Sequence, residues 1–399
     1  MKKFDLNFTV CLFLIVFLPE FVFVNFHQSS DAMGLFIGSI LILFLNYNYL
    51  IKLKIHLRYF LFTLIAFSFI FAESSISYIF ANESKPIDSL LPFLLIVLSG
   101  FVLSRRLITL NLPEITNAFL VIIIYLLALG WIKILKPSFF FVFFSEPSHY
   151  ILMLGIITVA YTLISKKIPL FIIFINFLIF SIFLPSLESL VFAFLVLFVG
   201  SLRLKLRYLL IIFLIILVLL PILTSWILSF DYFKSRLNFE TKSNLTTLVF
   251  IQGWQLAYKN FIDTNGLGLG FQMLGLSGTH YPSATRTILR LQHGDGGFLN
   301  TEDGGFIDSK LIAEFGFIGI IISLIYIVFL VKFIIKTNLV LTSLKHNLNN
   351  KKYYQIKKSI ILNGIIFGFL VEFFFRGIGY FSGGVYLVLL VLFYKIQSF

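Results

Sequence analysis

Long apolar runs alternate with short polar breaks along almost the whole chain. A helix needs about 20 apolar residues to cross the hydrocarbon core of a membrane. We predict about 12 transmembrane helices, at residues 6–24, 33–51, 57–80, 87–103, 115–135, 148–164, 168–184, 188–201, 207–229, 309–331, 358–376 and 380–396. The run at 188–201 is short, and it could instead form one broken unit with 168–184. The pattern predicts an all-α polytopic membrane protein.

One polar stretch, residues 230–308, interrupts this pattern. It separates the predicted spans of residues 1–229 from those of residues 309–399. Within it we predict a helix over about 244–262, because Ser243 or Asn244 can cap its start and Asn265-Gly266 can end it. This stretch is the only segment long enough to fold outside the bilayer. We therefore expect the chemistry there, or where the stretch meets the membrane.

Composition and charge agree with a membrane protein. Hydrophobic residues make up 59% of the chain and charged residues 12%, against about 25% charged in soluble domains. With the N-terminus in the cytoplasm, the cytoplasmic segments hold 20 of the 31 Lys and Arg, and the short outer loops hold four. Cytoplasmic loops of membrane proteins carry such an excess. This predicts cytoplasmic termini and an outer location for 230–308, and the net charge of +13 then reflects topology rather than nucleic-acid binding.

The sequence motifs do not indicate a bound nucleotide or metal cofactor. Gly266, Gly268 and Gly270 alternate, but a nucleotide-binding loop needs a preceding strand and a following helix. A close backbone approach to another element explains them better. Cys11 is the only cysteine, and the histidines and acids of the polar stretch fit no standard metal-ligand spacing.

Three arginines could bind a phosphate group, and one glutamate could help to hold such a site together. The planar fork of arginine matches phosphate oxygens in pairs. Arg236 follows a predicted membrane exit, where a lipid-linked phosphate would lie. Arg290 lies further along the chain, where surface solubility is an equal alternative. Arg376 follows Glu372 by four residues in an apolar helix, so the two can pair on one face. A charge within the membrane is expensive, so this pair is expected to face the bundle interior, although a purely structural pair remains an alternative.

Other residues could act as a general base. Glu146-Pro147-Ser148-His149 opens the sixth predicted span on its outer side and offers a carboxylate and an imidazole, although an acid before a proline is also ordinary helix-start chemistry. His293 and Asp303 lie in the polar stretch. Acids in or beside spans, such as Glu20, Glu73 and Glu188, are also features that a proton-coupled transporter uses.

The architecture of the whole chain resembles the bacterial O-antigen polymerase (Wzy) family of polysaccharide-assembly proteins. Three segments carry the resemblance. Residues 236–271, including Gln252-Gly253-Trp254, are similar to the outer-loop signature of the family. Residues 303–319, beginning Asp303-Gly304-Gly305-Phe306, look like its loop-to-span re-entry, and residues 146–149 resemble its acidic-proline-serine element.

The resemblance implies glycosyl transfer at the outer face of the bacterial inner membrane. A growing glycan on undecaprenyl pyrophosphate would be passed to a new lipid-linked repeat unit, with no nucleotide sugar, metal or redox cofactor. A chain-length regulator is an implied partner. We hypothesise that Arg236, with Arg376 or Arg290, holds the pyrophosphate, with Trp254 and Glu372 on the walls of the same site. The base would be Asp303, Glu146, His149 or His293.

Two rival functions remain open. The related O-antigen ligases resemble this chain, but usually carry a histidine where the long loop re-enters the membrane. Here that place reads Asp303-Gly304-Gly305-Phe306, and the nearest histidine is His293, which favours a polymerase. A flippase or exporter of lipid-linked sugars would be expected to lack one long outer loop.

Overall fold

The computed structural model describes residues 4–26, 32–51, 64–65, 67–75, 85–136, 142–164, 168–184, 186–204, 245–274, 306–343, 350–377 and 379–398, with isolated positions between 214 and 234. Every regular element in these ranges is helical, which confirms the predicted all-α class for this part of the chain. The chain divides into two compact units. Unit 1 comprises residues 1–60, 91–205 and 332–399, and unit 2 comprises residues 61–90 and 206–331.

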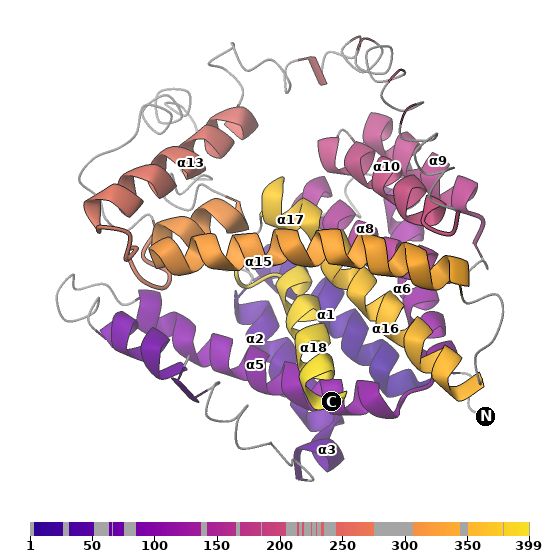
Figure 1. The fold of residues 1–399 in the computed structure, drawn as a ribbon, viewed down its shortest axis with the longest axis horizontal. Coiled ribbons are helices and arrows are strands. Elements are labelled where there is room, and N and C mark those ends of the chain that lie inside the picture. Colours follow the sequence, from indigo (N-terminus) through magenta and orange to yellow (C-terminus); the bar gives the residue numbers. More distant parts are fainter. Residues whose placement is uncertain are drawn as a thin grey trace. The chain divides into compact units, whose positions relative to one another are not determined.

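Unit 1 holds most of the helices (Figure 1). They are α1 (Leu6–Asn25), α2 (Ala32–Leu45), α3 (Tyr47–Ile51), most of α5 (Lys85–Thr109), α6 (Leu112–Leu135), α8 (Pro147–Thr162), α9 (Leu170–Phe183), α10 (Leu187–Ser201), the end of α15 (Ile307–Ser343), α16 (Asn350–Gly368), α17 (Leu370–Phe374) and α18 (Gly383–Ser398). Unit 2 contains α13 (Leu245–Asp263), at the place of the helix predicted over 244–262, and most of α15.

Four helices in the described ranges are long and apolar enough to cross a membrane. They are α1, α5 from Pro86 onward, α6, and α15 as far as Thr342. Helices α2, α9, α10 and α18 are apolar but shorter. The predicted span at 207–229 lies outside the described residues except for isolated positions, and the span at 57–80 is described only in part.

The structure differs from the predicted pattern near the C-terminus. Lysines and asparagines are frequent over about 332–357, and this composition predicts a solvated connector between two spans. In the structure, however, α15 continues to Ser343 and α16 already begins at Asn350. Apolar residues among the lysines sustain the helix, and the Asn338 side chain donates hydrogen bonds to the carbonyls of Leu202 and Leu204, each at 2.9 Å. The predicted span at 358–376 is also broken, since α16 ends at Gly368 and the short α17 follows.

Helix α8 forms the centre of unit 1. All of its residues from Tyr150 to Thr162 are buried, by packing against α6, α10, α16 and α18. A helix that is apolar on every side is expected to be enclosed in this way. Glycines allow the close approach: a Cβ on Gly364 would lie 2.8 Å from Cα of Ala160, and one on Gly368 would lie 3.0 Å from Cα of Ile156. Small residues promote such contacts between membrane helices.

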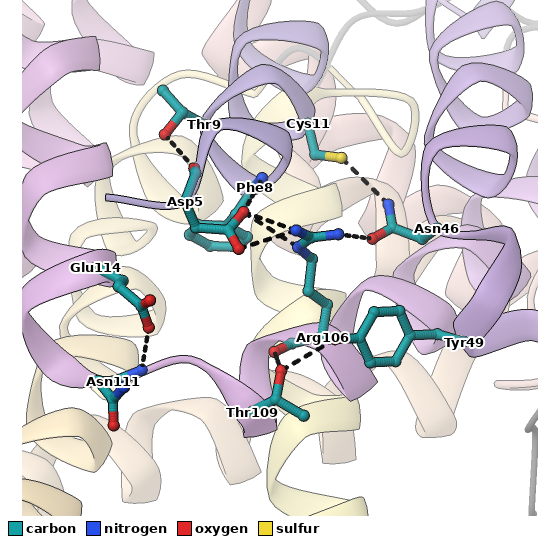
Figure 2. Close-up of polar contacts among 10 residues, drawn as sticks. All are labelled: Asp5, Phe8, Thr9, Cys11, Asn46, Tyr49, Arg106, Thr109, Asn111 and Glu114. Carbon is teal, nitrogen blue, oxygen red and sulfur yellow. Dashed lines mark hydrogen bonds and ion pairs between the residues drawn. The ribbon is translucent and has the colours of Figure 1, made fainter. Parts of the chain in front are cut away.

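A polar network ties α1, α2 and α5 together (Figure 2). The Arg106 guanidinium donates from Nη2 to both carboxylate oxygens of Asp5, each at 2.9 Å, and from Nη1 to Asn46 Oδ1 at 3.2 Å. Asn46 Nδ2 in turn donates to the buried Cys11 sulfur at 3.3 Å. Bidentate arginine–carboxylate pairs fix geometry as well as charge, so this network sets how α1, α2 and α5 meet.

The packing of α2 on α1 generates a stability prediction. A Cβ on Gly34 would lie 2.5 Å from the Cα of Pro19, whereas one on Gly100 in α5 would meet only the Phe393 ring at 3.5 Å. Since backbone cannot yield easily, we expect Gly34→Ala to destabilise the protein by about 1–3 kcal/mol. Gly100→Ala should be neutral or slightly stabilising, because alanine favours helix. The buried thiol of Cys11 reacts with a fluorogenic dye only on unfolding, so heating in detergent reports both variants. Equal unfolding temperatures would contradict the packing.

Candidate functional site

The strongest candidate site lies at the start of α8. Glu146 is the N-cap residue and Pro147 the first residue of the helix, a position where proline loses no helical hydrogen bond. The segment before it is held against α1, because the Asn25 side chain donates a 2.7 Å hydrogen bond to the carbonyl of Val142. The first turn of α8 is thereby brought beside the acidic residue Glu20 of α1.

Glu20 and His149 form a buried pair. Glu20 is only 4% exposed, and its Oε1 lies 2.5 Å from Nδ1 of His149. Its other oxygen, Oε2, accepts hydrogen bonds from the Ser145 hydroxyl at 2.6 Å and from the Ser145 backbone N–H at 3.0 Å. A buried carboxylate is tolerated when its oxygens are hydrogen-bonded and its charge is paired. Both oxygens are hydrogen-bonded here, and the charge is paired whenever His149 is protonated.

This pairing determines what His149 can do. Because Glu20 engages Nδ1, proton exchange with an external group has to use Nε2. A carboxylate that holds one ring nitrogen orients the imidazole and stabilises its protonated form, which is the arrangement that catalytic histidines use. The Glu20–His149 pair can therefore act as a general base.

A second ion pair lies beside the first. Arg376 Nη2 is 2.6 Å from Glu146 Oε2, which also accepts a 2.9 Å hydrogen bond from the Ser148 hydroxyl. Burial by itself would raise the pKa of Glu146, but the charges of Arg376 and His149 and these hydrogen bonds hold it below its ordinary value. The carboxylate therefore stays charged below the usual glutamate pKa of about 4.3. Any stability from the pair is present above that pH and is lost as the pH falls through the lowered pKa.

The predicted pairing of Glu372 with Arg376 is wrong. Helix α17 ends at Phe374, so Arg376 leaves the helical path and turns to Glu146 instead. Glu372 is fully buried, and neither of its carboxylate oxygens has a hydrogen-bond partner among the described residues. It lies directly against Gly384, where a Cβ would overlap Oε2, and its polar neighbours include the Ser382 hydroxyl and His149.

We call Glu20, Ser145, Glu146, His149 and Arg376 the α8 cluster. Three of its members, Glu146, His149 and Arg376, were candidates from sequence, and the structure brings them together. Glu20 and Ser145 were not assigned to a site. An acid in an apolar span signals function by itself, but nothing in the sequence identifies a partner 129 residues away.

The alternating glycines belong to unit 2 and pack on the start of α15. Backbone N–H groups of Leu269 and Gly270 donate to the carbonyls of Ala313 and Glu314, at 3.0 and 2.8 Å. Gly268 has a φ of 89°, and a Cβ there would overlap the Glu314 carbonyl. The predicted close backbone approach is thus confirmed.

The remaining candidate residues lie elsewhere. Trp254 is half-exposed on α13 in unit 2, whereas the α8 cluster belongs to unit 1. Arg236, Arg290, His293 and Asp303 fall outside the described residues. In the ranges the structure covers, no three His, Cys, Asp or Glu side chains are grouped so that they could hold a metal ion.

Comparison with known proteins gives no match: no family model fits the sequence, and no curated protein or solved structure is similar to it.

The Glu20–His149 pair can be tested by a double-mutant cycle. We expect Glu20→Ala and His149→Ala each to lower stability, because each leaves a buried polar partner behind. Their combined effect should fall short of the sum by about 0.5–3 kcal/mol, as for residues in direct contact. Glu20→Ala with Glu188→Ala is the control, since Glu188 pairs locally with Ser186, and these effects should add. Additive effects of Glu20→Ala and His149→Ala would exclude the pair.

Proposed function

We propose that this chain is a polysaccharide polymerase of the O-antigen type. Such a membrane glycosyltransferase joins oligosaccharide repeat units carried on undecaprenyl pyrophosphate at the outer face of the bacterial inner membrane. The observation that carries the proposal is the α8 cluster: an imidazole oriented by a buried carboxylate, beside an arginine at one end of a bundle of apolar helices. The reaction needs a base and a cation for its leaving group, and the cluster supplies both.

The proposed topology has about 12 spans, cytoplasmic termini and an outer location for residues 230–308. Besides the charge asymmetry of the loops, the ends of α8 support it. The α8 cluster lies at the start of the helix. At its other end, the Arg203 side chain donates to the carbonyl of Thr162. Lys358 lies toward that end too, because α16 passes α8 with Gly364 beside Ala160. The lysine- and arginine-rich end would face the cytoplasm.

The proposed step is a displacement at the anomeric carbon of the donor glycan. An acceptor hydroxyl gives its proton to Nε2 of His149 while its oxygen forms the new bond to that carbon. The bond from the carbon to the pyrophosphate breaks, and the pyrophosphate leaves with the electron pair. Arg376 would counter the charge on this leaving group, aided by Arg236 or Arg290. Glu20 would stabilise the imidazolium that forms.

Among the four candidate bases we prefer His149, because the structure shows its imidazole held at Nδ1 by the Glu20 carboxylate. Glu146 is engaged by Arg376, Asp303 is supported by the motif resemblance alone, and His293 is supported only by its place in the polar stretch. The Asp303-Gly304-Gly305-Phe306 re-entry departs from the ligase pattern, which keeps polymerase ahead of ligase. A chain-length regulator remains a proposed partner, implied by the family resemblance.

The glycan pattern of a deletion strain tests the proposal. Loss of a polymerase should leave lipid A core carrying a single repeat unit, and the wild-type gene should restore the ladder of chain lengths on a gel. His149→Ala should not restore it, because a general base contributes about 10²- to 10⁴-fold in rate. Glu188→Gln, which removes a carboxylate from the first turn of α10, should restore the ladder fully.

Other glycan patterns would contradict the proposal. A deletion that leaves no attached glycan would indicate a ligase, and one that strands the repeat unit in the cytoplasm would indicate a flippase. A normal ladder from His149→Ala would remove this residue from the reaction.

A further inference from the structure

Arg376 uses only part of its hydrogen-bonding capacity within the described part of the chain. Its guanidinium carries five N–H donors, yet its side chain makes one hydrogen bond to the described part of the chain, from Nη2 to Glu146 Oε2. The side chain is 23% exposed, so the guanidinium is not fully enclosed by the protein. Arginine commonly binds carboxylate or phosphate through two parallel hydrogen bonds. Because Arg376 makes a single such hydrogen bond to the described part of the chain, its guanidinium could form a second one to an anion with more oxygens, such as phosphate.

Glu146 is held weakly by comparison with Glu20. It occupies the N-cap position, but its side chain does not cap α8. The Glu146 side chain is 52% exposed, and the described hydrogen bonds of its carboxylate come only from Arg376 and Ser148. Exposed ion pairs contribute little stability. Its carboxylate can therefore leave Arg376 without breaking a hydrogen bond of the buried Glu20–His149 pair.

We propose that the Glu146 carboxylate is an internal ligand of a phosphate-binding site formed by Arg376 and the Ser148 hydroxyl, and that an incoming phosphate group displaces it. A carboxylate and a phosphate oxygen accept the same hydrogen bonds, so the present contacts show how a phosphate oxygen would be held. The identification of this phosphate as the pyrophosphate of a lipid-linked glycan rests on the proposed function. Glu146 is then the group that the leaving pyrophosphate replaces, and the base is His149.

Pyrophosphate binding to the purified full-length protein in detergent tests this inference, with calorimetric titration as the readout. Glu146→Gln keeps the size of the side chain but removes the competing charge. Since an exposed pair is formed only about 1.5 to 5 times more often than it is open, we expect inorganic pyrophosphate to bind about two- to sixfold more tightly. Arg376→Gln should abolish or strongly weaken binding, and Glu188→Gln should bind like wild type. Thermal unfolding shows that each variant is folded.

A double variant separates occupation of the site from repulsion at a distance. In the Arg376→Gln background, Glu146→Gln should leave the residual affinity for pyrophosphate unchanged. Without the guanidinium, the Glu146 carboxylate no longer competes with pyrophosphate for the same hydrogen-bond donors. The same two- to sixfold gain in that background would show general repulsion and overturn the inference. Weaker binding by Glu146→Gln alone would also overturn it, since Glu146 would then help to hold the ligand. Absence of pyrophosphate binding in the wild type and in Glu146→Gln would remove the site altogether.

A further titration distinguishes a lipid-linked phosphate from a free phosphate anion as the ligand of this site. Tighter binding of farnesyl pyrophosphate than of inorganic pyrophosphate would assign the site to a prenyl-linked ligand, and equal affinities would assign it to the free anion. The glycan ladder of the deletion strain is independent of these titrations. If the glycan pattern is that of a ligase or flippase but the pyrophosphate affinities are as predicted, the polymerase proposal is rejected and the proposed anion site is supported.

Discussion

Glu20 places a carboxylate inside a bundle of apolar helices, where water cannot solvate it. An uncompensated charge there would cost several kcal/mol, so its partners must be present whenever the bundle is folded. Those partners come from one short segment, because Ser145 and His149 together satisfy both oxygens. This requirement fixes the first turn of α8 against α1. The proposed chemistry of His149 follows from it, since the carboxylate that the imidazole pairs with also fixes the orientation of the ring.

The position of α8 extends this constraint through unit 1. The helix is buried along its whole length after its first turn, and its neighbours approach through glycines of α16. Its charged neighbours in the described part of the chain include groups near both ends. At one end lie the α8 cluster and the buried Glu372. Toward the other, Arg203 and Lys358 bind backbone carbonyls, and Arg106 joins α1, α2 and α5. The proposed reaction would use the end that carries the α8 cluster, whereas the basic side chains at the other end make structural contacts.

Local sequence patterns predict the helices well and their partners poorly. Apolar runs locate α1, α6 and α8 to within a few residues, and the glycines near Gly268 correctly indicate a close backbone approach. The Glu372–Arg376 pairing failed because four-residue spacing matters only while the helix continues, and α17 stops at Phe374. The connector predicted over 332–357 failed because lysines and asparagines were taken as a break, although the residues between them sustain helix. The Glu20–His149 pair could not be predicted, since it depends on how two distant helices pack.

The most direct test of the central claim, that the α8 cluster faces the outer side of the membrane, is the accessibility of introduced thiols. Replacing Cys11 by serine removes the only native thiol. Ser148→Cys then probes the start of α8, and Thr109→Cys probes the end of α5, beside the Arg106 network. Both positions are at least partly exposed. With a membrane-impermeant maleimide and an intact inner membrane, we expect the Ser148→Cys variant to react and the Thr109→Cys variant to react only after the membrane is opened. The reverse pattern would place the α8 cluster in the cytoplasm and contradict the proposed function.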